Sequence, residues 1–240
     1  MSGPQCCENP PTLSSSCGSG HVKQLGGLST YVNCPPGSKN AILLVSDVFG
    51  YEAPNLRKLA DKIAAAGFCV VVPDFLHGDP FVPANAETRP FDAWRKAHEV
   101  GKIFEESKPV IEALKSSGVS SIGAAGFCWG AMVIVELAKH DYIQAAVLCH
   151  PSFVTLDDIK AVNVPTSVLG AEIDHITPVE TIKQFEEVLA AKTEVDSFVK
   201  IFPGVKHGWT VRYDAEDPAA VKCAEEAHQD MLDWFVKYVK

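Results

Sequence analysis

Hydrophobic residues recur along the chain in two patterns. Short apolar runs such as 41–46 have no polar face, which is typical of strands buried on both sides of a sheet. Stretches such as 55–66 place apolar residues three or four positions apart, which predicts helices with one buried face. After an opening hairpin, the predicted strands are 41–46, 68–72, 121–127, 144–149, 166–170 and 197–202. The predicted helices are 55–66, 92–116, 128–139, 179–190 and 218–239.

The order of these elements predicts the fold class. Strand–helix–strand units build parallel sheets whose helices cover both faces. Residues 22–33 are an exception, because Gly26 and Gly27 suit a tight turn between two short antiparallel strands. Pro109 is expected to break or kink the helix 92–116, since proline lacks the N–H that a helix interior uses. An α/β architecture with a mostly parallel sheet follows.

The chain has one candidate domain and one candidate extension. Its 240 residues, 47% of them hydrophobic, are enough for one sizeable core, and neither a repeat nor a linker divides them. Residues 1–20 are rich in proline, serine and glycine. We therefore expect an N-terminal extension over 1–20 and a single domain over 21–240.

Charge and hydropathy exclude several classes of partner. The 21 basic and 30 acidic residues give a net charge of −9, without the basic cluster that nucleic acid or an anionic membrane requires. The sequence has neither a signal-peptide pattern nor the apolar run of about 18 residues that a membrane span needs. We expect a cytoplasmic protein, monomeric or weakly dimeric, whose partner is a small molecule.

The eight cysteines are too few, in a chain of this length, to indicate a disulfide scaffold. Cys69 and Cys149 lie in apolar strands, where free thiols are usually buried, and we expect the cysteines to be reduced. Cys6, Cys7 and Cys17 lie in the extension without the paired Cys-x-x-Cys of zinc sites. We interpret these three as incidental thiols and expect no metal ion.

The segment Gly126-Phe127-Cys128-Trp129-Gly130 lies where a predicted strand meets a predicted helix. It matches the nucleophile elbow Gly-x-Ser-x-Gly with sulfur in place of oxygen. The two glycines are required because side chains at those positions would clash in so sharp a turn. An inert buried thiol in a chance match is the alternative. Its place at a strand-to-helix junction favours Cys128 as a nucleophile.

The expected acid and base follow in the chain order of α/β-hydrolases, which is nucleophile, acid, histidine. Asp174 comes after the predicted strand 166–170, and His207 comes after the predicted strand 197–202. Glu172 and His175 are neighbouring rivals, which we interpret as a solvated carboxylate and a polar loop residue. We expect His207 to be oriented by Asp174 and to take the thiol proton.

Two backbone N–H groups are needed to bind the oxyanion of an acyl-transfer reaction. The residue after the nucleophile, Trp129, and the residue Val48 in the loop after the third strand are the candidates. Asp47 lies beside Val48, where an acid would be placed to contact Cys128. The alternative for Asp47 is a turn residue, which is a common role of aspartate.

These motifs together resemble the dienelactone hydrolase (carboxymethylenebutenolidase) family, from about residue 21 to the C-terminus. The resemblance is carried by Asp47-Val48-Phe49-Gly50, Pro73-Asp74-Phe75, Gly126 to Gly130, Gly170 to Pro178 and His207-Gly208-Trp209. It implies an α/β-hydrolase fold with an eight-stranded sheet, a Cys-His-Asp triad and a cytosolic enzyme that needs no cofactor. Bacterial members carry glutamate where this chain has Asp47, and that glutamate interacts with the resting thiol. By resemblance, Asp47 modulates the reactivity of the nucleophile.

The resemblance also implies how substrate is bound. Bacterial members hold an anionic lactone with two arginines, and of these only the second has a counterpart here, Arg212, which is offset in register. Arg89 and Arg95 are further candidates for contact with a substrate carboxylate. Phe49 and Trp209, which belong to the shared motifs, are expected to contact the substrate as well. The missing first arginine argues against dienelactone itself as the physiological substrate.

The function expected from the sequence is hydrolysis of a carboxylic ester or lactone through an acyl-enzyme. Some plant and fungal branches of the family carry a label as β-glucanases, an activity that requires a pair of carboxylates around a sugar-binding cleft. A catalytically silent hydrolase that acts as a small-molecule receptor is a second alternative. A redox protein is the least supported class, because no resolving cysteine lies near Cys128 in the sequence.

Overall fold

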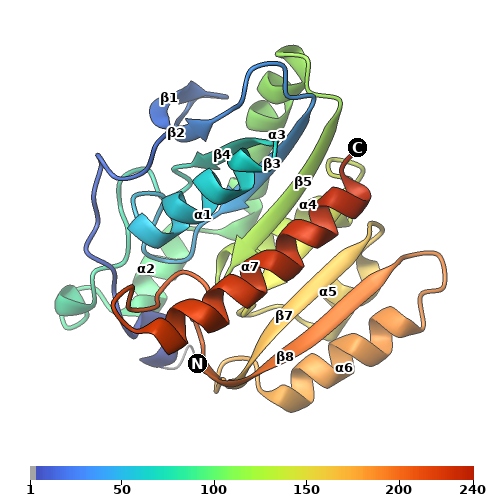
Figure 1. Cartoon of the computed structure of the whole chain (residues 1–240). Helices are drawn as coiled ribbons and strands as arrows, with labels where there is room; N and C mark the ends of the chain where they lie inside the picture. Colours follow the sequence, from blue (N-terminus) through green and yellow to red (C-terminus); the bar gives the residue numbers. More distant parts are fainter. Residues whose placement is uncertain (1–3) are drawn as a thin grey trace.

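The computed structural model describes residues 4–240 and contains an eight-stranded sheet with the order β1-β2-β4-β3-β5-β6-β7-β8 (Figure 1). β2 is antiparallel to both of its neighbours, and the remaining pairs are parallel. The predicted mostly parallel sheet is therefore confirmed. The strands are β1 (His21–Leu25), β2 (Leu28–Asn33), β3 (Asn40–Val45), β4 (Cys69–Pro73), β5 (Ser121–Phe127), β6 (Ala145–Cys149), β7 (Thr166–Ile173) and β8 (Ser197–Lys206).

Helices cover both faces of this sheet. On β3, Leu43 and Val45 pack into one hydrophobic cluster, and Ile42 and Leu44 pack into the other. The first cluster is completed by α3, α4, α5 and α6, and the second by α1 and α7, which lie on the near side of the sheet in Figure 1. The helices are α1 (Pro54–Ala65), α2 (Phe91–Ala97), α3 (Val100–Ser116), α4 (Gly130–Ala138), α5 (Leu156–Ala161), α6 (Val179–Ala190) and α7 (Pro218–Tyr238). Both faces of β3 are buried, as its unbroken apolar run predicts.

The predicted helix 92–116 is two helices, and Pro109 does not separate them. The break lies at His98 and Glu99, between α2 and α3, and Pro109 lies inside α3. The β1–β2 turn packs directly on the helix backbone at this point, because a Cβ on Gly26 would lie 2.4 Å from the Val110 nitrogen. Gly26 has a positive φ of 59° and no side chain, so it permits both the turn and the close approach.

A disulfide joins Cys34 to Cys69, so the expectation that the cysteines are all reduced is wrong for this pair. Strand pairing explains it. Asn33 on β2 faces Val70 on the antiparallel strand β4, and the next positions outward are Cys34 and Cys69. The other cysteines of the described chain are free thiols.

The N-terminal extension packs on the domain. It opens with a short 3-10 helix, η1 (Pro4–Cys7), and continues beside α1. The buried guanidinium of Arg57 on α1 donates hydrogen bonds to the carbonyls of Ser15 (2.9 Å) and Cys17 (3.3 Å). Between residues 4 and 240, no helix has both the length and the apolar character needed to cross a bilayer.

Candidate active site

Cys128 lies in a sharp turn between β5 and α4. Its φ is 53°, in the left-handed region that residues with a side chain rarely adopt. A Cβ on Gly126 would lie 2.5 Å from the Gly130 carbonyl oxygen, and a Cβ on Gly130 would lie 2.5 Å from the oxygens of Val45 and Ser46. Both glycines of the motif are thus required by contact. The geometry is that of a nucleophile elbow, which holds Cys128 at the carboxyl end of the sheet.

His207 and Asp174 lie together at the same end of the sheet. Both are buried, and His207 Nδ1 donates a hydrogen bond of 2.7 Å to Asp174 Oδ2. Asp174 Oδ1 accepts hydrogen bonds from the N–H groups of Ile176 (2.8 Å) and Thr177 (3.1 Å), which fix the carboxylate. With Nδ1 donating to Asp174, Nε2 of His207 is free to act on the cysteine side.

The charge environment of His207 favours its protonated form once Cys128 has become a thiolate. Burial lowers its pKa, but the neighbouring Cys128 and the hydrogen bond to Asp174 outweigh this effect and raise the pKa to about 9. The rivals of the two residues are engaged elsewhere. Glu172 accepts a hydrogen bond from the Gly204 N–H at 2.6 Å, and the His175 side chain is exposed.

Ser152 connects the thiol to the imidazole. Its hydroxyl lies 3.3 Å from Cys128 Sγ and 3.4 Å from His207 Nε2, and the residue is fully buried. The loop after β6 places it there, and the Ser152 N–H donates to the Cys128 carbonyl at 3.0 Å. Sequence reasoning missed this residue because no motif surrounds it. The strand-end position after 145–149 is the signal that points to it.

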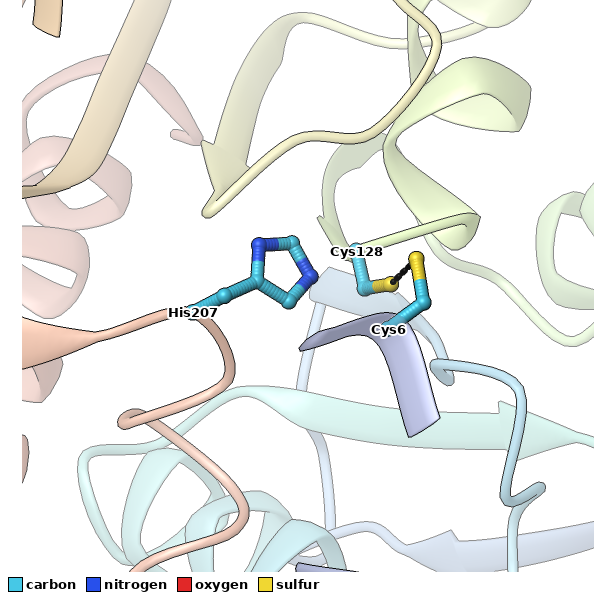
Figure 2. A group of neighbouring side chains, drawn as sticks. All are labelled: Cys6, Cys128 and His207. Atoms are coloured by element: carbon cyan, nitrogen blue, oxygen red, sulfur yellow. Dashed lines mark hydrogen bonds between the residues drawn. The ribbon is translucent and has the colours of Figure 1, made fainter. Parts of the chain in front are cut away.

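Cys6 of the extension lies in the same site. Its sulfur is 3.6 Å from Cys128 Sγ and 3.6 Å from Ser152 Oγ, and Figure 2 shows the two thiols facing each other beside His207. Burial and the neighbouring Cys6 raise the pKa of Cys128 well above its usual value. The hydrogen bond from Cys128 lowers the pKa of Cys6. The pKa values of the two thiols are therefore shifted in opposite directions.

Cys6, Cys128 and His207 also form the one group in the described chain whose side chains suit a metal ion. Sulfur atoms of Cys6 and Cys128 and a ring nitrogen of His207 all lie within 4.8 Å of one another. Two thiolates and an imidazole are typical zinc ligands. An ion held there would occupy the expected nucleophile and the expected base at once.

Val48 and Trp129 are both buried beside the elbow. Neither backbone N–H donates a hydrogen bond to another group among residues 4–240. Asp47 does not hydrogen-bond to Cys128 in this part of the chain. Its Oδ1 accepts from the Phe49 N–H at 2.9 Å, as a turn aspartate does, and its Oδ2 lies 3.2 Å from Arg212 Nε. Burial raises the pKa of Asp47, and Arg212 opposes the shift.

The side chain of Arg212 contacts the N-terminal extension in the structure. Its side chain is 2% exposed, and Nη1 donates to the carbonyls of Gln5 (3.3 Å), Cys6 (3.0 Å) and Glu8 (3.1 Å). The guanidinium carbon also lies 5.5 Å from the centre of the Phe49 ring. Nη2 of Arg212 is buried without a hydrogen-bond partner in the described structure.

The other residues expected to bind substrate contact other side chains of the protein. Trp209 is buried and packs on His150, with ring centres 5.4 Å apart. Arg89 forms an ion pair with Asp79 (2.6 Å), and Arg95 lies over the Phe153 ring at 4.9 Å. An open cavity of about 380 Å³ adjoins the site; its lining includes Asn9, His207, Trp209, Arg212, Asp214 and Asp217.

Comparisons with known proteins identify the family of the chain. Residues 28–239 match the dienelactone hydrolase family. The chain is 33% identical over 225 residues to a carboxymethylenebutenolidase homolog of Xenopus tropicalis, in an alignment that covers 92% of this chain and 91% of that protein. A putative dienelactone hydrolase from Klebsiella pneumoniae has a similar structure, with a TM-score of 0.73, 19% identity and coverage of 88% of this chain and 93% of that one. This last likeness shows the fold.

A plant relative has a different name. The chain is 42% identical over 202 residues to an endo-1,3;1,4-beta-D-glucanase of Zea mays. The alignment covers 80% of this chain but only 63% of that protein, so the chain spans less than two thirds of this relative.

Proposed function

The chain belongs to the dienelactone hydrolase family, as its motifs predict, and on this premise we propose that it hydrolyses a carboxylic ester or lactone through Cys128, His207 and Asp174. One observation carries the proposal. A continuous polar path runs from Asp174 to His207, from His207 to Ser152 and from Ser152 to Cys128, with steps of 2.7, 3.4 and 3.3 Å. A nucleophile, a base and an orienting acid in this order activate a thiol for acyl transfer.

The proposed reaction starts with transfer of the Cys128 proton to His207 through the Ser152 hydroxyl. The thiolate attacks the carbonyl carbon, and the N–H groups of Val48 and Trp129 bind the resulting oxyanion. His207 then protonates the leaving alkoxide, the carbon–oxygen bond breaks, and a thioester remains on Cys128. Water, deprotonated by His207, attacks the thioester, releases the carboxylic acid and restores the thiol.

Substrate binding in this proposal uses the groups around Arg212. Phe49 and Trp209 border the site, and Arg212 supplies a buried positive charge with an unpartnered Nη2. A carboxylate on the substrate would form charge-assisted hydrogen bonds with this group. Asp47 modulates the nucleophile indirectly in this account, because it orients the guanidinium that contacts the Cys6 carbonyl.

The name of the maize relative makes β-glucan hydrolysis the second candidate. That reaction needs two carboxylates on either side of a glycosidic bond. The cavity beside His207 contains Asp214 and Asp217, but both are engaged in local turns. Asp214 accepts from the Glu216 N–H at 2.9 Å, and Asp217 caps α7 by accepting from the Ala219 N–H at 2.9 Å. Their present contacts support capping roles.

The two candidates are separated by one pair of assays. The reduced protein is incubated with p-nitrophenyl acetate and, in parallel, with a mixed-linkage β-glucan. We expect ester hydrolysis by the wild type and by Cys17→Ser, a control at a half-buried free thiol that contacts the Ser14 carbonyl. Cys128→Ser should retain the fold, by circular dichroism, and lose ester hydrolysis. Glucan cleavage without ester hydrolysis would contradict the proposal, and turnover of neither would favour a receptor.

A further inference from the structure

Residues 5–8 cover the proposed nucleophile. Cys128 and Cys6 are both 0% exposed, and their sulfurs are in contact at 3.6 Å (Figure 2). A reacting carbonyl must approach a nucleophile to about 3–3.5 Å. Cys6 occupies that approach, so substrate reaches Cys128 only after the segment has moved.

The segment is held by specific hydrogen bonds to the loop that carries Asp174. The Gln5 side chain donates from Nε2 to the Ile173 carbonyl (3.0 Å) and accepts at Oε1 from the His175 N–H (2.6 Å). Ile173 and His175 flank Asp174 on both sides. One amide side chain therefore ties the extension to the backbone around the catalytic acid.

Arg212 holds the other side of the segment. One guanidinium nitrogen donates to three carbonyl oxygens, those of Gln5, Cys6 and Glu8. Gly208, next to His207, makes room for this side chain. A Cβ there would lie 2.2 Å from Arg212 Nε, and its φ of 90° also favours glycine. The charge-assisted contacts place the Cys6 sulfur against Cys128 rather than toward solvent.

We propose that residues 5–8 are a redox-controlled plug, in which Cys6 and Cys128 form a reversible disulfide that closes the site and protects Cys128 from further oxidation. The bond formation does not depend on hydrolase activity, whereas its effect on turnover rests on the role proposed above for Cys128. The sulfurs must approach from 3.6 Å to about 2.05 Å, the length of an S–S bond. Cys6 lies on a four-residue 3-10 helix, and a local shift of this short segment would bring its sulfur to that distance.

Hydrogen peroxide is the oxidant in the proposed reaction. One sulfur of the pair, as a thiolate, attacks a peroxide oxygen, the O–O bond breaks, and hydroxide leaves and takes up a proton to become water. The second thiolate attacks the sulfur of the sulfenic acid so formed, the S–S bond forms as the S–O bond breaks, and the hydroxide that leaves takes up a proton to become a second water molecule. Two thiols lose two electrons and the peroxide gains them. A dithiol such as dithiothreitol reverses the bond by exchange.

The first test detects the bond itself. The full chain is treated with hydrogen peroxide in the presence of a chelator, which keeps metal ions off Cys6, Cys128 and His207, and is then digested without reduction. We expect a Cys6–Cys128 linked peptide that disappears after dithiothreitol. A linked peptide that contains Cys7 or Cys17 in place of Cys6, or no linked peptide to Cys128, would overturn the proposal. This readout is independent of any substrate.

The second test measures protection. Each variant is exposed to excess peroxide and then reduced, and its p-nitrophenyl acetate hydrolysis is compared with its own starting value. Wild type, Cys7→Ser and Cys17→Ser should recover almost fully. Cys6→Ser should lose most of its activity, because Cys128 without a resolving thiol proceeds to sulfinic acid, which dithiothreitol does not reduce. Equal recovery of Cys6→Ser and wild type would show that Cys6 does not protect.

A third test opens the plug without touching its thiols. Gln5→Ala removes two hydrogen bonds between the segment and the Asp174 loop. Their loss should raise the rate of Cys128 alkylation by iodoacetamide about tenfold. Gln24→Ala, on the exposed strand β1, is the control and should leave that rate unchanged. An unchanged rate in Gln5→Ala would mean that the segment does not restrict access.

Discussion

Two pairs of cysteines meet in this molecule, and they differ in what brings them together. Cys34 and Cys69 are joined, and the register of two neighbouring strands places them opposite each other. Cys6 and Cys128 are separated by 122 positions and remain two thiols, which contact each other through a docked extension. The first pair belongs to the sheet and the second to the site. We propose that the disulfide set by strand register serves the fold, whereas the thiol pair between the extension and the proposed nucleophile controls the chemistry of the site.

The largest effect is expected at the acid that orients the base beside the second pair. Asp174→Asn replaces the acceptor of the His207 Nδ1 hydrogen bond and should lower kcat/KM for p-nitrophenyl acetate by about 10⁴-fold. The KM should change much less than kcat. A loss below about tenfold would remove Asp174 from the triad.

The same variant should change the pH dependence of stability. The pKa of His207 lies at about 9 in the folded chain against an ordinary value of 6.5. Its protonation therefore stabilises the fold fully below about pH 6.5, and this contribution is lost as the pH rises toward about 9. Urea unfolding across this interval should show the loss in wild type and a smaller loss in Asp174→Asn. Identical curves would contradict the assigned charge state.

Removal of the Cys34–Cys69 disulfide should lower the free energy of unfolding and leave kcat unchanged. The disulfide closes a separation of 35 residues, and the chain-entropy model gives about 4 kcal/mol for a loop of this length. We expect the double variant Cys34→Ser/Cys69→Ser to unfold at lower urea concentration by that free energy. Its kcat at 25 °C, measured while folded, should match wild type. A large fall in kcat with unchanged stability would reverse the roles assigned to the two pairs.

Removal of the hydroxyl beside the second pair should have an intermediate effect. Ser152→Ala deletes the bridge between Cys128 Sγ and His207 Nε2. Since the two groups lie within 4.8 Å, direct transfer after a small shift can replace the bridge, and we expect kcat to fall about tenfold. The control Ser107→Ala removes another buried hydroxyl, on α3, and should leave kcat unchanged.

The smallest effect is the change in the free energy of unfolding when Cys6, a member of the second pair, is replaced. Cys6→Ser keeps a polar group beside Ser152 and Cys128, and should lower the free energy of unfolding by about 1 kcal/mol or less. Urea unfolding of this variant beside Cys34→Ser/Cys69→Ser measures the contrast directly. Equal losses in the two would show that both pairs serve the fold.

The contrast also explains what the sequence predicts and what it does not. Cys128, Asp174 and His207 are predictable because each follows a buried strand, and the carboxyl ends of parallel strands meet at one edge. The elbow adds a local constraint that the sequence displays. Gly126 and Gly130 are part of the motif because a Cβ at either position would clash with the backbone. The structure brings all three residues together at that edge.

Other features depend on pairings that the sequence does not display. The Cys34–Cys69 disulfide follows from the contact of β2 with β4, which skips the intervening strand β3. Cys6 lies in a proline-rich segment without hydrophobic periodicity, and its place is set by Gln5 and Arg212. No proline marks the break between α2 and α3 at His98 and Glu99, while Pro109 is tolerated inside a helix.

The central claim, that Cys128 is the residue acylated during ester hydrolysis, is tested most directly by trapping the acyl-enzyme. The reduced protein is mixed with excess p-nitrophenyl acetate, quenched in acid within the first turnover and mapped by peptide mass spectrometry. We predict one acetyl group on the Cys128 peptide, removed by neutral hydroxylamine as a thioester is, and none on the same peptide of Cys128→Ala. Continued hydrolysis by Cys128→Ala, or first-turnover acetylation at another residue with Cys128 unmodified, would contradict the account.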